Sequence, residues 1–176
     1  MTTFSDVYAT QPVAKFGTEE QLQTMLQPLI EGKTRVCFGV TEPNSGLETL
    51  ALKTTAKREG DSYVISGQKI WTSSAQVASH MVLLARTTPM EEVKKKSEGL
   101  SLFFIELDKS DPGLEMKKIK KMGGRAVDAN EVFFDNYRIP AKTLIGSEGQ
   151  GFKIVSHESF CSEMLLILSG SPWYEC

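Results

Sequence analysis

The chain has 176 residues, of which 40% are hydrophobic, and a formal net charge of -2 at pH 7. This length and composition suit one globular domain with its own core, and the balanced charge gives no electrostatic basis for binding nucleic acid or a membrane surface. The 3 cysteines form no CxxC pattern, and the longest apolar run, residues 164–168, is too short to span a bilayer. We therefore expect reduced thiols, an intracellular location, and neither a zinc site nor a transmembrane helix.

One amphipathic helix is predicted ahead of the first strand. Thr18 followed three residues later by Gln21 is the pattern of a capping box, in which each side chain bonds to the backbone of the other residue. Apolar side chains then recur at helical spacing until Gly32, which we expect to end the helix. Pro28 lies inside this window and predicts a kink or an early end, because proline lacks the N–H of a helical hydrogen bond.

Between residues 36 and 139 the pattern changes to short apolar runs separated by turn residues, as expected for an all-β domain. The sequence Glu-Gly-Asp at residues 59–61 predicts a hairpin turn. Strands of this number and shortness favour closed or double-sheet packing, which removes exposed edges. A glycine-containing loop at residues 146–151 then leads into a helix that begins near Gln150 or Gly151. The expected strands are residues 36–40, 52–58, 63–66, 70–73, 81–85, 100–107, 114–119 and 131–137.

The turn at residues 41–46, TEPNSG, is the first candidate for chemistry because it directly follows an apolar strand. Pro43 fixes one backbone angle and the small residues after it tolerate tight geometry, so several N–H groups can point at one acceptor. A polar, anionic or heteroaromatic ligand fits such a cradle. The run that closes on residues 70–73 adds a tryptophan ring beside two hydroxyls. Together the two segments offer the donors and the aromatic wall that a planar redox cofactor requires.

The chain contains, in order, KFGTEEQ, LIEGK, CFGVTEPNSG, YVISGQKIWTS, MGGR, EVFFDNYRIP and LIGSEGQGF. These blocks extend from about Phe16 to Val155 and resemble the middle domain of the acyl-CoA dehydrogenases. The resemblance implies a mainly β fold, an antiparallel β-barrel or orthogonal β-sheets, with an N-terminal and a C-terminal helix. It divides the chain into the tail of an N-terminal helical domain (1–34), a flavin- and acyl-CoA-binding domain (35–142) and the start of a C-terminal helical domain (143–176). The resemblance fades beyond Val155, which indicates either a truncated or alternatively terminated product or an unusual variant.

The same resemblance implies FAD-dependent α,β-dehydrogenation of an acyl-CoA thioester. It also implies a homo-oligomer in the full-length family and an electron-transfer flavoprotein as electron acceptor. The catalytic base of the family, a Glu, lies in the C-terminal helical domain, so we assign no residue here as the base and expect no turnover by this chain alone. Two alternatives stay open: an acyl-CoA oxidase, distinguished by peroxide formation, and a non-catalytic module that binds acyl-CoA or a partner subunit. The implied location is the mitochondrial matrix in a eukaryote and the cytoplasm in a bacterium.

The resemblance also assigns roles to individual residues. Thr41, which alone would be interpreted as a residue that caps the strand-turn junction, is implied to hold the pyrimidine edge of the flavin, where negative charge collects on reduction. Trp71 is implied to pack on the flavin, and Ser73 to bond near the ring nitrogen that receives the hydride. Leu47 departs from the family, which commonly has Ser there, and cannot donate a hydrogen bond. The predicted cofactor-binding residues are Phe38, Val40, Thr41, Gly46, Leu47, Trp71, Thr72 and Ser73, and the predicted substrate-binding residues are Ser45, Leu47, Asp128, Ala129, Asn130 and Glu131.

Other polar features are interpreted as structural. The lysine-rich stretches at residues 94–96 and 117–121 are typical of solvated faces, although a phosphate or an acidic partner is an alternative. His80 and His157 have no spacing that indicates a catalytic triad or a metal site. Arg125, after two glycines, is suited to a structural carboxylate or to a phosphate.

Overall fold

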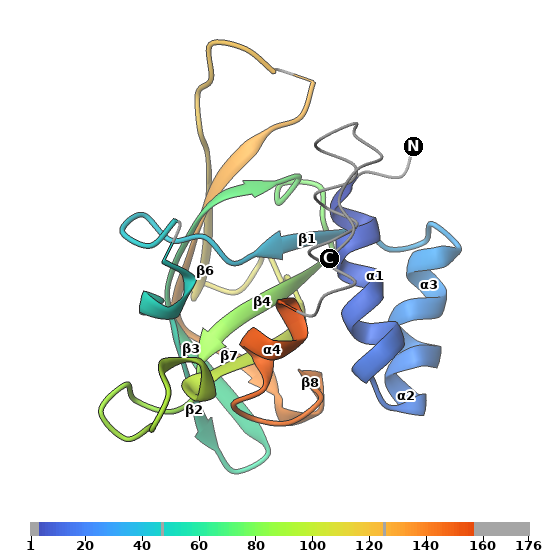
Figure 1. Cartoon of the computed structure of the whole chain (residues 1–176). Helices are drawn as coiled ribbons and strands as arrows, with labels where there is room; N and C mark the ends of the chain where they lie inside the picture. The colour runs from blue at the N-terminus through green and yellow to red at the C-terminus, as the bar shows by residue number, and fades with distance from the viewer. Residues whose placement is uncertain (1–3, 47, 125, 157–176) are drawn as a thin grey trace, which may run out of the picture.

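The structure, a computed structural model, describes residues 4–46, 48–124 and 126–156, with side chains from residue 10 onward. Its centre is an eight-stranded sheet, and helices from both ends of the chain pack beside it (Figure 1). The strands are β1 Val36–Gly39, β2 Thr55–Glu59, β3 Ser62–Ser73, β4 His80–Arg86, β5 Leu100–Glu106, β6 Leu114–Lys118, β7 Ala129–Pro140 and β8 Leu144–Ile145. The helices are α1 Phe4–Phe16, α2 Glu19–Gln21, the π-helical η1 Leu22–Leu26, α3 Gln27–Ile30 and α4 Gly151–Val155, with 3-10 turns η2 Thr49–Ala51, η3 Lys96–Gly99 and η4 Ala141–Thr143. The prediction of a mainly β chain with a helix at each end is therefore confirmed.

The strands lie in the order β6-β7-β3-β2-β4-β5-β8, and β1 also pairs with β4. Pairing is antiparallel except at β4, where β1 and β2 run parallel to it. The β2–β3 hairpin turns at Gly60, whose φ of 60° suits glycine because it has no Cβ, as the sequence predicted. β3 joins two predicted runs into one strand of 12 residues, with two register shifts in its pairing with β7.

The central strand β4 is buried on both faces, which explains its continuous apolar sequence. Alternate side chains enter two separate clusters. Met81 and Leu83 pack in a first cluster that also contains Phe103 of β5 and Val132 of β7, so the sheet curls until its two halves meet. Val82 and its neighbour two residues on point to the second cluster, which the helices cover.

The N-terminal segment forms more helix than the sequence predicted. α1 was missed because it contains Pro12 and has little amphipathic periodicity, yet Val13 is fully buried against the sheet. The capping box is confirmed: Thr18 N donates to Gln21 Oε1 at 2.9 Å, and Gln21 N donates to Thr18 Oγ1 at 3.2 Å.

Pro28 does not end the helix as one alternative had it. It lies in α3, directly after the π-helical η1, and the helical backbone continues through it to Ile30. The helix ends at Ile30, and Gly32 follows the C-cap Glu31 with a φ of 70°, in agreement with the predicted stop at this glycine. Within the described part of the chain, no helix is both long and apolar enough to cross a membrane.

Candidate functional site

A bulge near the end of β3 turns Trp71 out of the sheet. Lys69 pairs with Val132 of β7, but the next pair is Thr72 with Asn130, so one extra residue of β3 is accommodated between them. Trp71 has a φ of 61° and is 56% exposed. The left-handed region is strained for a bulky side chain, and such strain is concentrated at functional sites. The bulge therefore presents a flat aromatic ring to solvent.

The turn at residues 41–46 lies directly beside this bulge. Ile70 N donates to Thr41 O at 2.9 Å, which joins the turn to the residue before Trp71. The turn closes on itself through Ser45 N and Glu42 O at 3.1 Å. Ser45 is buried and its hydroxyl donates to Glu48 O, whereas Gly46 is exposed and Thr41 is half-buried. The two segments that the sequence singled out are therefore adjacent.

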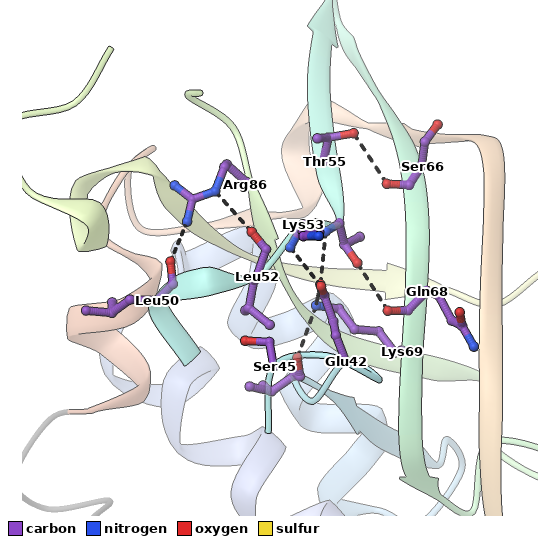
Figure 2. Close-up of polar contacts among 12 residues, drawn as sticks. Glu42, Ser45, Leu50, Leu52, Lys53, Thr55, Ser66, Gln68, Lys69 and Arg86 are labelled. Atoms are coloured by element: carbon purple, nitrogen blue, oxygen red, sulfur yellow. Dashed lines mark hydrogen bonds and ion pairs between the residues drawn. The ribbon is translucent and has the colours of Figure 1, made fainter. Parts of the chain in front are cut away.

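Beneath the turn lies a buried ion pair that the sequence did not indicate (Figure 2). The Lys69 ammonium lies 2.8 Å from Glu42 Oε1 and donates to Val40 O at 3.1 Å, and the two charged side chains are 0% and 7% exposed. The same carboxylate accepts from the backbone N–H groups of Lys53 at 2.7 Å and Thr54 at 2.9 Å. Five polar groups are thus satisfied inside the fold, as buried charge requires.

Burial lowers the pKa of Lys69 to about 8, although the Glu42 charge and hydrogen bond oppose this shift. Burial also acts to raise the pKa of Glu42, but the Lys69 charge together with the hydrogen bonds from Lys69, Thr54 and Lys53 outweighs it, so the pKa of Glu42 is lowered. The geometry therefore favours a carboxylate at Glu42 near neutral pH.

The segment that follows the turn is fixed by Arg86, whose side chain is largely buried (Figure 2). Its guanidinium donates to Leu50 O at 2.9 Å, Leu52 O at 3.2 Å and Lys96 O at 3.4 Å. A hollow of about 190 Å³ lies between this segment and the turn. Polar residues dominate its lining, which includes Asn44, Ser45, Lys53 and Gln68.

The predicted substrate-binding stretch at residues 128–131 lies along the other side of the bulge. Ser73 pairs with Ala129, and Ser74 N donates to Asp128 Oδ1 at 3.0 Å. The Asn130 amide donates to Thr72 O at 3.0 Å and to Asp128 Oδ2 at 3.1 Å. The structure therefore brings this stretch together with the end of β3.

Side-chain direction separates the predicted residues of this region into two groups. Val132 lies in the first cluster, so Asn130, two residues earlier, faces the same interior, as does its partner Thr72. Both side chains are buried, which supports a role in positioning the backbone. Ser73 and Glu131 occupy the opposite face and are only half-buried.

Two predicted residues, Phe38 of β1 and Val40 directly after it, belong to the strand that leads into the turn. Phe38 and Val40 pack against the second cluster, on the side that the helices cover, and are half-buried. Leu47, Arg125 and His157 lie outside the described residues.

The sequence did contain one signal for Lys69. Side chains alternate between the two faces of a strand, and residue 69 is on the same face as the buried Tyr63 and Ile65. The Cys37 thiol is buried, which raises its pKa to about 12 and makes it unreactive.

The family model for the middle domain of acyl-CoA dehydrogenases matches residues 37–137. This chain belongs to the acyl-CoA dehydrogenase family. The mitochondrial short-chain specific acyl-CoA dehydrogenase of Bos taurus is 39% identical over 144 residues, which are 81% of this chain and 34% of that protein. The chain thus spans about a third of the length of this curated relative.

Two solved structures of related proteins share the fold. Butyryl-CoA dehydrogenase from Megasphaera elsdenii is 33% identical with a TM-score of 0.76, over 84% of this chain and 38% of that one. The prolyl acyl carrier protein oxidase AnaB is 34% identical with a TM-score of 0.79, over 87% of this chain and 39% of that one. Both sequence identities are higher than a shared fold alone requires, and they agree with the family assignment.

Proposed function

We propose that this chain supplies the flavin-facing and thioester-facing β domain of an enzyme that performs FAD-dependent α,β-dehydrogenation of an acyl-CoA thioester. The observation that carries the proposal is the exposed Trp71, held at a left-handed φ beside the 41–46 turn. An indole in this position offers a flat apolar wall, and Thr41 and Ser73 add half-buried hydroxyls near it. This donor set suits a planar heteroaromatic group with polar edges.

When bound, FAD would supply the acceptor for the hydride that leaves the β-carbon of the thioester. The chain itself would bind the flavin ring and exclude water from it. Trp71 would cover one face of the ring system, and Thr41 would donate its hydroxyl to the polar edge. Ser73 would donate to a second edge atom from the outer face of β3. The catalytic base is not assigned to any residue of this chain.

The thioester would lie along the 128–131 stretch. Ser45 is buried and its hydroxyl already donates to Glu48 O, so it would shape the turn rather than contact the substrate. Asn130 is fully buried and would act on the substrate only by holding Asp128 and the Thr72 carbonyl in place. An electron-transfer flavoprotein as acceptor, a homo-oligomeric full-length protein, and the mitochondrial or bacterial cytoplasmic location remain parts of the same proposal.

The test is Trp71→Gly, measured by titration with FAD and by thermal unfolding. Glycine relieves the left-handed strain of about 1–2 kcal/mol while adding a comparable loss of backbone entropy, so stability should change little. The FAD dissociation constant should rise about tenfold or more, because a stacked aromatic surface is lost. Trp71→Phe should retain much of the affinity. Val77→Ala is the matched control, because Val77 is also 56% exposed.

Two outcomes would contradict the proposal. One is an unchanged FAD dissociation constant in Trp71→Gly. The other is no measurable binding of FAD by the unaltered chain, which would remove this chain's own part in holding the cofactor.

An oxidase is the second candidate, because AnaB, described as a prolyl acyl carrier protein oxidase, matches this chain as well as the dehydrogenase does. The two functions differ in what reoxidises the flavin. Stoichiometric hydrogen peroxide under air, from the complete FAD-loaded protein and a thioester, would favour the oxidase. Reduction of a dye without peroxide would favour the dehydrogenase.

A further inference from the structure

The geometry points to Glu42 and Lys69 as positioning residues that hold the ligand-binding turn against the Trp71 bulge. This inference rests on the proposed function, since it concerns the same site. The Lys69 side chain is 0% exposed, and the 7% exposed Glu42 borders the hollow but its two carboxylate oxygens already accept from Lys69 and from the N–H groups of residues 53 and 54. They can therefore affect binding only through the segments to which they bond.

The first argument is that Lys69 brackets Thr41. Its ammonium bonds to the residue before Thr41, at Val40 O (3.1 Å), and to the residue after it, at Glu42 Oε1 (2.8 Å). The next residue of β3, Ile70, donates its N–H to the carbonyl of Thr41 itself at 2.9 Å. Residues 40–42, where the chain enters the turn, are thus held by two consecutive residues that lead into the bulge.

The second argument is that Glu42 extends this arrangement to a third segment. Its carboxylate accepts from Lys53 N and Thr54 N, and the Thr54 hydroxyl donates to Gln68 O at 3.3 Å. Gln68 directly precedes Lys69, so the hydrogen bonds close a ring through the turn, the segment before β2, and β3 (Figure 2). Movement of any one segment would break bonds to the other two.

The third argument concerns what an ion pair provides that apolar packing does not. Two apolar side chains of similar volume would stabilise the fold at least as well, because a buried ion pair must overcome the desolvation of both charges. They could not donate to Val40 O or accept from the N–H groups of residues 53 and 54. The distinctive contribution of the pair is therefore the placement of the turn.

The experiment compares Lys69→Met with a control variant that should lose a similar amount of global stability. The control residue lies away from the turn. Ile105→Ala is suitable, because Ile105 is fully buried in the first cluster on β5 and pairs with β4. Both variants are made in a Trp173→Phe background, so that Trp71 is the only tryptophan. Hydrogen exchange of the backbone amides, acrylamide quenching of Trp71 fluorescence, and FAD titration are measured for each.

Lys69→Met should speed exchange at the amides of Lys53, Thr54 and Ile70 by about tenfold relative to Ile105→Ala, the equivalent of one hydrogen bond. It should also change the quenching of Trp71 and raise the FAD dissociation constant. Exchange and quenching equal to those of Ile105→Ala would overturn the inference. If the unaltered protein binds no FAD, the proposed function fails, while exchange and quenching still decide whether Glu42 and Lys69 position the turn.

Discussion

Replacing Lys69 with methionine should lower the free energy of unfolding by about 3–5 kcal/mol, the range measured when one partner of a buried ion pair is removed. Methionine is close to lysine in length, so cavity formation contributes little. The penalty arises because the Glu42 carboxylate loses the ammonium at 2.8 Å and keeps only two backbone N–H groups, at 2.7 and 2.9 Å. Val40 O loses its donor as well. For a chain of this size the unfolding midpoint should fall by about 6–20 °C.

The origin of this penalty can be tested by adding Glu42→Gln. The amide removes the buried charge and keeps one oxygen that can accept from Lys53 N or Thr54 N, so the double variant should recover about half of the loss or more. Urea unfolding, followed by circular dichroism near neutral pH, would give the free energies of all four proteins of the cycle. A loss below about 1 kcal/mol in Lys69→Met, or a double variant less stable than Lys69→Met, would refute the reasoning.

Two further predictions concern the same region. The pKa of Glu42 in the folded protein is lowered from 4.5, so its ionisation stabilises the fold fully above that value and progressively less as pH falls through the folded pKa. Urea unfolding should therefore show that Glu42→Gln is less stable than the unaltered chain near neutral pH and that the difference is small in acid. Gly67→Ala should lower the free energy of unfolding by about 1–3 kcal/mol, since a Cβ there would lie 2.6 Å from Thr54 Cα at a φ of 145°. Thermal unfolding of Gly60→Ala, where a Cβ meets nothing within 4 Å, is the control and should show the smaller loss.

Patterns local in sequence predicted much of the fold. The capping box at Thr18 and the hairpin turn at Gly60 depend on residues a few positions apart, and the structure contains both; most predicted strands are present, although β3 and β7 are longer than the sequence predicted. The mainly β class and the family resemblance followed from the order of these blocks. The sequence also predicted that the 41–46 turn and Trp71 belong together, and a backbone hydrogen bond from Ile70 to Thr41 joins them.

Other features depended on strand order and burial, which no local pattern carries. β1 runs parallel to β4, and the hairpin of β2 and β3 lies between these two strands in the sequence. α1 becomes stable only where Val13 can be buried against the sheet, since its own sequence contains a proline and has weak periodicity.

The candidate site, like the fold, has some features that the sequence predicted and others that it did not. Sequence alone identified the polar turn, the tryptophan and the hydroxyls, because residue type and spacing determine what donors and rings a segment can offer. Only the tertiary structure decided that Trp71 is exposed at a left-handed φ, that Asn130 faces the interior, and that Lys69 is buried against Glu42. The physical reason is that burial and charge pairing join groups that are distant in the chain, here 27 residues apart, and their energies depend on everything packed around them.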